Sequence, residues 1–414
     1  MRKQVKMKPI QSISGKIKNS NKDVDIELNG KNLIIAGGNG SGKTSLVSAI
    51  HQTLTTQIIQ QQIRNIPNYE RNIKTFTEAL SQPNLDPATR LNYEQSLLHS
   101  QQALDGIIGP LKITYNNDPN LLIDIYIEKK ASIRFFAAGR MAEISSVSSA
   151  TASQPDINSI DINARLGGNL EQHLVNLKVR SALAMQAGEE GKRPVHAEEW
   201  IASFTENLKY LFEDQSTELH FAPDQLRFYI SQNGKPRYNF QSLSSGYLAI
   251  FEIYADLLMH TEYAQIKPSE LTGIVVIDEI DAHLHVSLQR KILPFFTSSF
   301  PAIQFIVTTH SPFVLTSVDD AVIFDISTCQ TVLNLSMYSY ESVAEGLLGV
   351  PPISKIFEDT IKKLTKITST DFFDLKLAED LLNTIAPHID VLDAESEMFY
   401  QIAANKIIKM KAEN

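Results

Sequence analysis

The sequence predicts an α/β fold built on a parallel sheet, and three segments carry that prediction. The first is a glycine-rich stretch, Gly37–Thr44, between the apolar run Asn32–Ala36 and the helix-like run Ser45–Ile50. The second is Ile274–Ile277, four β-branched residues followed by two acids, and the third is Ile303–Thr308. Apolar runs of this kind are typical of buried parallel strands, whose carboxyl ends are where α/β sheets bind ligands.

The glycine-rich stretch matches G-x-x-x-x-G-K-[ST], the pattern of a phosphate-binding loop. Its glycines let successive backbone N–H groups point at one anion without Cβ clashes, and the following helix adds its dipole. We expect Lys43 to reach the β- and γ-phosphates and the Thr44 hydroxyl to bind Mg²⁺. A glycine turn without a ligand is disfavoured by the flanking strand and helix. The residues predicted to bind nucleotide here are Gly37, Gly38, Asn39, Gly40, Ser41, Gly42, Lys43, Thr44 and Ser45.

Polar residues after the other two strands predict the rest of a hydrolytic site. Asp278 is expected to hold Mg²⁺, directly or through water, together with Thr44. Glu279 is expected to polarise the attacking water as general base. The alternative, two acids that cap the next helix, fits less well with a phosphate-binding loop upstream. His310, after the third strand, is predicted to donate a hydrogen bond to the γ-phosphate.

A helix start precedes the acidic strand. Leu243–Tyr247 opens the apolar helical run Leu248–Met259. Ser244, Ser245 and Gly246 make a small-residue helix N-terminus, which predicts a second anion site. Taken alone, this segment would favour an ordinary serine N-cap without a ligand.

These four segments, in this order, resemble the ABC-type ATPases. Leu243–Tyr247 is similar to the L-S-G-G-Q signature, Asp278–Glu279 to Walker B with its catalytic glutamate, and His310 to the H-loop. Asp278–His285 and Thr308–Pro312 resemble more narrowly the SMC-like group. That group contains the OLD-family ATPases and the ATPase subunits of bacterial anti-phage systems such as Septu, retrons and PARIS.

The resemblance implies a P-loop ABC-type ATPase head that binds ATP and Mg²⁺ and hydrolyses ATP slowly, in a regulatory role. Because one chain carries one phosphate-binding loop and one signature, a head-to-tail homodimer or higher homo-oligomer is expected. The nearest groups imply an anti-phage complex in which this subunit controls a separate effector, a nuclease or toxin. The alternative is an SMC-like DNA-repair or chromosome-handling ATPase that binds DNA directly.

The sequence departs from the family pattern at several points. Ser245 stands where the first signature glycine would be and Tyr247 where the glutamine would be, which puts the hydrolysis geometry in doubt. No Q-loop glutamine can be identified, which disfavours a transporter subunit. No TOPRIM nuclease is evident after His310, which disfavours a full OLD nuclease.

Changes in composition along the chain predict three regions. The expected regions are an ATPase domain (1–54 and 108–335), a helical hairpin insertion (55–107) and a helical C-terminal region (336–414). Polar helices at Asn68–Leu80 and Ala88–Ile107 flank a proline-containing turn, which favours a projecting arm over two core helices. Leu111–Tyr115 and Leu121–Ile127 are predicted to form a β-hairpin around Asn116–Pro119.

Composition limits the class of protein. The chain has 414 residues, 43% of them hydrophobic, and a net charge of −9, so a generally basic nucleic-acid surface is absent. A lysine-protected edge strand is favoured over a nucleic-acid patch at residues 1–22, although contact with DNA or RNA stays open. The basic residues there are Arg2, Lys3, Lys6, Lys8, Lys16, Lys18 and Lys22. One cysteine, no apolar run of membrane-span length and no secretory signal predict a cytoplasmic protein without membrane contact.

Two further sets of residues leave alternatives. Asp281, His283 and His285 could bind a metal, but a turn that faces a partner subunit is favoured. Arg134 and Arg140 could each approach a phosphate or make a surface ion pair.

Overall fold

The structure is a computed structural model, and the chain divides into two compact units, Met1–Tyr338 and Ser339–Asn414. The described residues are 8–17, 22–140, 143–147, 149–150, 161, 163–187, 197–332, 335, 338–348, 355–369, 374–391 and 394–413. Four residues of the predicted basic segment, Arg2, Lys3, Lys6 and Lys18, lie outside these ranges.

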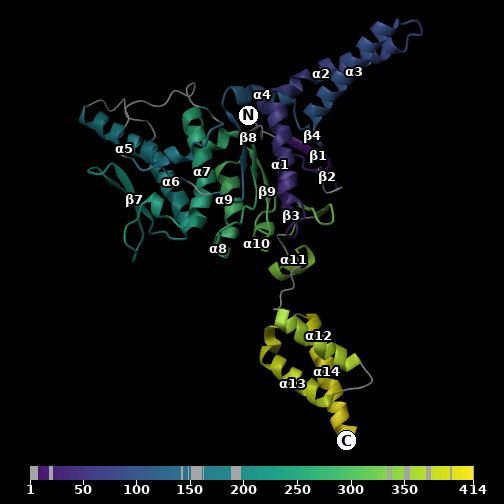
Figure 1. Cartoon of the computed structure of the whole chain (residues 1–414). Coiled ribbons are helices and arrows are strands. Elements are labelled where there is room, and N and C mark those ends of the chain that lie inside the picture. Colours follow the sequence, from purple (N-terminus) through teal and green to yellow (C-terminus); the bar gives the residue numbers. More distant parts are fainter. Residues whose placement is uncertain are drawn as a thin grey trace, which may run out of the picture. The chain divides into compact units, whose positions relative to one another are not determined.

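The first unit is built on a six-stranded sheet in the order β11-β10-β3-β9-β8-β5 (Figure 1). Five of its strands are parallel and β11 pairs antiparallel at one edge. The strands are β3 (Asn32–Ala36), β5 (Ala131–Phe136), β8 (Thr272–Ile277), β9 (Ile303–Thr308), β10 (Ala321–Asp325) and β11 (Gln330–Val332). Every residue of β3, β8 and β9 is buried, as their apolar runs predict. Because these three strands are neighbours, the polar segments that follow them lie at the same end of the sheet.

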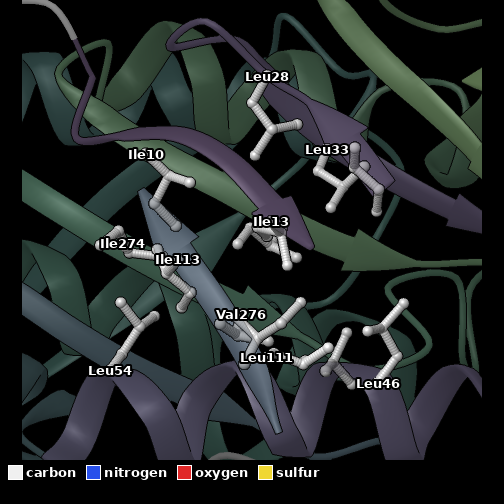
Figure 2. Packing of buried hydrophobic residues seen from close by; sticks show 14 of the residues in the cluster. Ile10, Ile13, Leu28, Leu33, Leu46, Leu54, Leu111, Ile113, Ile274 and Val276 are labelled. Carbon is white, nitrogen blue, oxygen red and sulfur yellow. The ribbon is translucent and has the colours of Figure 1, made fainter. Parts of the chain in front are cut away.

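A smaller antiparallel sheet, β2-β1-β4, lies over one face of the central sheet and encloses the main core with helix α1 (Lys43–Leu54). Its strands are β1 (Ile10–Lys16), β2 (Asp23–Glu27) and β4 (Leu111–Tyr115). Figure 2 shows Ile13 and Leu111 packed between the sheets and the α1 residue Leu46. The fully buried Gln304 side chain joins the two sheets, because it accepts from Ile10 N at 2.7 Å and donates to Ile10 O at 3.2 Å.

The predicted helical run Leu248–Met259 is confirmed, and helices cover the rest of the first unit. They are α5 (Leu170–Gln186), α6 (Ala197–Phe212), α7 (Ser245–Ala264), α8 (Val286–Gln289), α9 (Ile292–Ser299) and α10 (Pro312–Leu315). A two-stranded sheet, β6 (Glu218–Ala222) with β7 (Arg227–Ser231), lies between α6 and α7 in the chain.

The predicted helical hairpin is formed by α2 (Ile66–Leu80) and α3 (Pro87–Ile108), which project from the sheets (Figure 1). The Asp86 side chain caps α3 by accepting from Ala88 N and Thr89 N. No residue of α2 is buried, and α3 buries only Ser100 and Ile107. The two helices therefore form an arm, as their polar composition predicts.

The β-hairpin predicted for residues 111–127 is wrong in its second half. Leu111–Tyr115 is strand β4, but its partner is β1, and residues 119–127 form helix α4 (Pro119–Ile127). The Asp118 side chain accepts from Asn120 N and Pro119 occupies the first turn, which is a strong helix start. The Asp-Pro pair that suggested a turn therefore begins a helix.

The second unit is helical, as predicted for this region. Its helices are α11 (Tyr340–Gly346), α12 (Lys355–Ser369), α13 (Leu375–Ile385) and α14 (Ala394–Glu413). A small core that includes Leu364, Ala378 and Ala403 holds α12, α13 and α14 together. Among the described residues of both units, no helix is long and apolar enough to cross a membrane.

Candidate nucleotide-binding site

The glycine-rich loop joins β3 to α1, and its backbone requires glycine at several points. Gly37, Gly40 and Gly42 have φ values of 144°, 73° and 106°, and Gly42 is the N-cap of α1. A Cβ at Gly37 would lie 2.7 Å from Ile326 Cγ2, so the loop fits closely against the segment after β10. This strand, loop and helix arrangement confirms the structural context that the phosphate-loop pattern needs.

Lys43 is the one buried cation of this loop. Its Nζ donates to the carbonyl oxygens of Gly37 and Gly38, both at 2.9 Å. Burial lowers the pKa of Lys43, and the nearby carboxylates of Glu279 and Asp278 oppose that shift. The ammonium group therefore lies at the loop, next to the acids that follow β8.

Thr44 and Asp278 meet although they come from different strand ends. Thr44 Oγ1 donates to Asp278 Oδ2 at 2.8 Å, and Thr308 Oγ1 donates to Asp278 Oδ1 at 2.6 Å. Asp278 is 3% exposed, and its carboxylate is held by these two hydroxyls. A hydroxyl and a buried carboxylate are hard oxygen donors of the kind that Mg²⁺ prefers. The predicted pair for Mg²⁺ is therefore brought together.

Glu279 is half-buried and has an unusual backbone conformation. Its φ is +46°, in the left-handed region that a residue with a side chain rarely adopts. Its N–H donates to Thr308 Oγ1 at 2.7 Å, so this one hydroxyl contacts both predicted acids. Thr308 was not predicted as a functional residue; its position beside His310 in the Thr-Thr-His segment was the available signal.

His310, which follows β9, lies beside Lys43 of the phosphate-binding loop. Its Nδ1 is 3.5 Å from Lys43 Nζ. Burial, and then the charge of Lys43, lower the pKa of His310, which keeps the ring neutral near pH 7. A neutral ring has one nitrogen that donates and one that accepts.

The turn after Glu279 is held by the segment after β9. Thr309 Oγ1 donates to Asp281 Oδ1 at 2.6 Å, and Ser311 Oγ donates to Gln289 Oε1 at 2.7 Å. Within the described ranges, no group of three or more His, Cys, Asp or Glu side chains is placed to hold a metal ion. The metal alternative for Asp281, His283 and His285 therefore has no support.

The signature-like segment begins helix α7. Ser244 is its N-cap, and both Ser244 and Ser245 are exposed. Gly246 is buried, and a Cβ there would lie 2.8 Å from the carbonyl oxygen of His283. Only glycine lets α7 pack this closely on the turn after Glu279. In the described structure, no hydrogen bond joins Ser244–Gly246 to the phosphate-binding loop.

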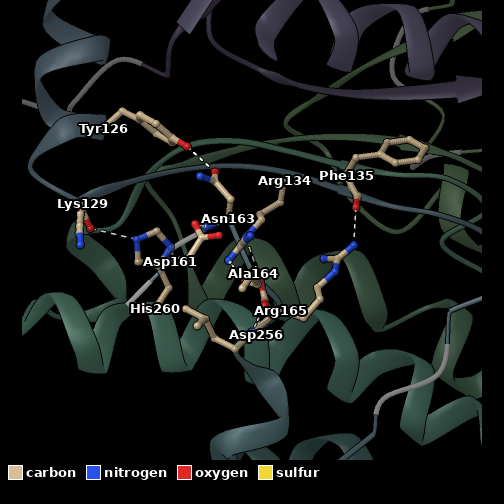
Figure 3. Close-up of polar contacts among 11 residues, drawn as sticks. Tyr126, Lys129, Arg134, Phe135, Asp161, Asn163, Ala164, Arg165, Asp256 and His260 are labelled. Carbon is tan, nitrogen blue, oxygen red and sulfur yellow. Dashed lines mark hydrogen bonds and ion pairs between the residues drawn. The ribbon is translucent and has the colours of Figure 1, made fainter. Parts of the chain in front are cut away.

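Arg134 and Arg140 are both only 5% exposed, so the surface ion pair that was one alternative is wrong for each. Arg134 forms a buried ion pair with Asp256, Nε to Oδ2 at 3.1 Å, and donates to the Ala164 carbonyl (Figure 3). Arg140 instead donates to backbone carbonyls of the turn at Asp278–Ile280. No sequence pattern indicated that contact.

Comparisons with known proteins give a family and several partial matches. A family model described as "AAA domain" matches residues 4–219, which is slightly more than half of the chain. A second AAA-domain model, whose description also names the AbiEii toxin of a type IV toxin–antitoxin system, matches residues 143–316.

Two curated relatives carry names from bacterial defence systems. The chain is 45% identical over 80 residues to "Retron Ec83 probable ATPase" of Escherichia coli, across 19% of this chain and 15% of that protein. It is 40% identical over 80 residues to "Septu protein PtuA" of Bacillus mycoides, across 19% of this chain and 11% of that protein. The chain thus spans no more than 15% of the length of either relative.

Among solved structures, the SMC head domain from Thermotoga maritima is similar, with 14% identity and a TM-score of 0.35 over 79% of this chain and 98% of that one.

Proposed function

The chain belongs to the AAA domain family, and on that premise we propose that it binds ATP with Mg²⁺ and hydrolyses it. The observation that carries the proposal is the contact between Thr44 and Asp278 at 2.8 Å, with Lys43 at the glycine loop beside them. These are the groups that phosphoryl transfer needs: a cradle of backbone N–H groups, a cation, and an oxygen pair for Mg²⁺.

In the proposed reaction, the loop Gly37–Gly42 and Lys43 bind the β- and γ-phosphates. Thr44 and Asp278 would hold Mg²⁺, which neutralises charge on the transferred phosphate. Glu279 accepts a proton from the attacking water, and His310 donates a hydrogen bond to the γ-phosphate.

A complete site is proposed to need two copies of the chain. Ser244 and Ser245 are exposed at the start of α7 and make no capping hydrogen bond within the described residues, so their hydroxyls can contact a ligand of another subunit. A two-fold dimer would place each signature against the ATP of its partner. Hydrolysis removes the γ-phosphate that bridges the two subunits, so turnover loosens the dimer.

The proposed biological role is that of an anti-phage subunit that controls a separate effector. The names of the partial relatives support it, and so do two features that offer surfaces to a partner, the α2–α3 arm and the helical second unit. The proposed boundaries stay 55–107 for the arm and 336–414 for the second region.

The described basic residues favour this role over direct DNA binding. Lys8 Nζ donates to Asn32 Oδ1 at 3.0 Å, and Lys22 Nζ donates to the carbonyl oxygens of Ser41 and Ile326 at 2.9 Å. Lys16 pairs with Asp23 at 3.7 Å. These three lysines contact protein groups, and the exposed Lys16–Asp23 pair places an acid beside that lysine.

A phage challenge tests the role. Cells that carry the gene with its genomic neighbours should resist phage, and cells with Lys43→Ala in the same cluster should not. Resistance from this gene alone, or equal resistance with Lys43→Ala, would refute ATP-dependent control of a separate effector. MgATP hydrolysis by the purified chain tests the biochemical activity independently.

A further inference from the structure

We propose that Arg140 is a positioning residue for hydrolysis, which holds the backbone of Asp278–Ile280 in the conformation from which Glu279 acts. The inference rests on the proposed function, because Glu279 is the base of that reaction. Within the described residues, the hydrogen bonds of Arg140 are to backbone carbonyls of its own chain.

The guanidinium contacts three consecutive peptide groups. One terminal nitrogen of Arg140 donates to Asp278 O at 2.7 Å and to Ala137 O at 3.1 Å. The other donates to Glu279 O and Ile280 O, both at 3.0 Å. Because a guanidinium is planar and rigid, these bonds fix the carbonyls of Asp278, Glu279 and Ile280 relative to one another and to Ala137.

These carbonyls need such a partner because the strand has ended. Strand β8 finishes at Ile277, and one more bond, Asp278 N to Phe136 O at 2.8 Å, continues its pairing with β5. Glu279 then turns into the left-handed region at φ +46°, so its carbonyl leaves the ladder. Buried carbonyls outside a sheet must be paired. The Glu279 carbonyl also accepts from Ala282 N at 2.9 Å, and Arg140 adds a side-chain donor there and donates to the neighbouring carbonyls of Asp278 and Ile280. The N–H of Glu279 donates to the Thr308 hydroxyl, so side chains contact both the N–H and the carbonyl of Glu279.

The charge of Arg140 also links this turn to the signature helix. Among the carboxylates that stabilise its charge, Glu252 of α7 has the largest effect. Arg140 Nε and Glu252 Oε2 are both buried and have no hydrogen-bond partner within the described residues. Helix α7 also packs on the same turn at Gly246 and His283. The turn that carries Glu279 is therefore held between Arg140, which follows β5, and α7, the helix that begins with the signature-like segment.

Arg134 offers a matched control. It lies on β5, is as buried as Arg140 and also carries a buried charge, but its partners are Asp256 and Ala164 (Figure 3). Replacing either arginine by lysine keeps the charge and removes the planar set of N–H donors. A general cost of disturbing a buried arginine would appear in both variants, whereas a positioning effect would appear only in Arg140→Lys.

The experiment measures ATP hydrolysis, ATP binding and amide hydrogen exchange in full-length wild type, Arg140→Lys and Arg134→Lys. We expect Arg140→Lys to lower kcat by about ten-fold to 100-fold, with KM within about three-fold of wild type, because misplacing a catalytic group by about 1 Å has effects of that size. Exchange should rise in residues 279–284 but not in β8. Arg134→Lys should show neither change.

Three results would overturn the proposal. They are an unchanged kcat in Arg140→Lys, equal losses of kcat in both variants, and unchanged exchange at residues 279–284. If wild type does not hydrolyse ATP, the proposed function fails, and the exchange measurement alone then decides the role of Arg140. Should Arg140→Lys not fold, Arg140→Gln replaces it, because its amide keeps planar donors without a buried charge.

Discussion

Thr44 Oγ1 donates a hydrogen bond of 2.8 Å to Asp278 Oδ2, across 234 residues of sequence. The contact joins the first turn of α1 to the end of β8, with β9 between β8 and the strand that precedes α1. The Thr308 hydroxyl on the intervening strand bonds the other oxygen of the same carboxylate. The proposed magnesium site is thus assembled from three neighbouring strand ends, and its geometry can be tested one group at a time.

Asp278→Asn is expected to abolish the effect of Mg²⁺ on ATP binding. The amide keeps the shape of the side chain but removes the charge that attracts the cation. A Mg²⁺ titration of the affinity for a fluorescent ATP analogue should show at least a ten-fold tightening for wild type, about 1.4 kcal/mol, and none for the variant. Thr77→Val on the exposed arm serves as the control. A wild-type response in Asp278→Asn would rule out this carboxylate as the Mg²⁺ site.

Lys43→Ala should remove nucleotide binding. The variant loses the buried ammonium group of the loop, and hydrogen bonds to charged groups contribute about 1.5 to 3 kcal/mol each, so affinity should fall on the order of 100-fold. Fluorescence polarisation of a labelled ATP measures this loss, with Lys74→Ala on the exposed arm as control. Binding at the wild-type level would contradict the assignment of the phosphate site.

Glu279→Gln should bind MgATP but turn it over about 10² to 10⁴ times more slowly, because it removes the general base. The nucleotide-bound dimer should also last longer, since the bridging γ-phosphate is no longer removed. Single-turnover hydrolysis and size-exclusion chromatography in MgATP measure the two effects. If turnover and dimer lifetime both match wild type, another group is the base.

A mixing experiment tests the two-subunit site. Ser244→Asp keeps a good N-cap residue but places a negative charge where the phosphate of a partner would lie. Alone, Ser244→Asp and Lys43→Ala should each be inactive. A 1:1 mixture should regain about one quarter of wild-type turnover, because half of the dimers carry one intact site out of two. No recovery in dimers shown to exchange subunits would argue for a site within one chain.

Stability should depend on pH through His260. This side chain is 1% exposed, its Nε2 bonds the Lys129 carbonyl at 2.9 Å, and burial lowers its pKa to about 4 (Figure 3). The unfolded chain therefore takes up a proton at higher pH than the folded chain does. The free energy of unfolding of the first unit should fall as pH drops from 6.5 towards 4, by up to about 3 kcal/mol.

Chemical unfolding at several pH values checks this prediction. His260→Gln keeps a donor for the Lys129 carbonyl and should flatten the pH dependence, whereas His99→Gln on the exposed arm should leave it unchanged. An equally steep fall in His260→Gln would assign the effect to other groups.

The sequence by itself determined the parts of this protein that depend on local pattern. The glycines at positions 37, 40 and 42, the buried strands β3, β8 and β9, and the polar arm follow from conformational freedom, apolar runs and helical period. Local pattern also gave a wrong β-hairpin at Asp118–Pro119, because these two residues are common both in turns and at helix starts.

The tertiary structure decided what holds the site together. The order of strands in the sheet puts the Thr308 hydroxyl beside Asp278, and the end of β5 brings Arg140 to the turn of Glu279. Arg134 and Arg140 looked alike in the sequence, yet one pairs with Asp256 and the other with three carbonyls. A buried donor takes whichever acceptor packing places within about 3 Å, and that acceptor here lies more than 100 residues away in the chain, beyond the range of any local pattern.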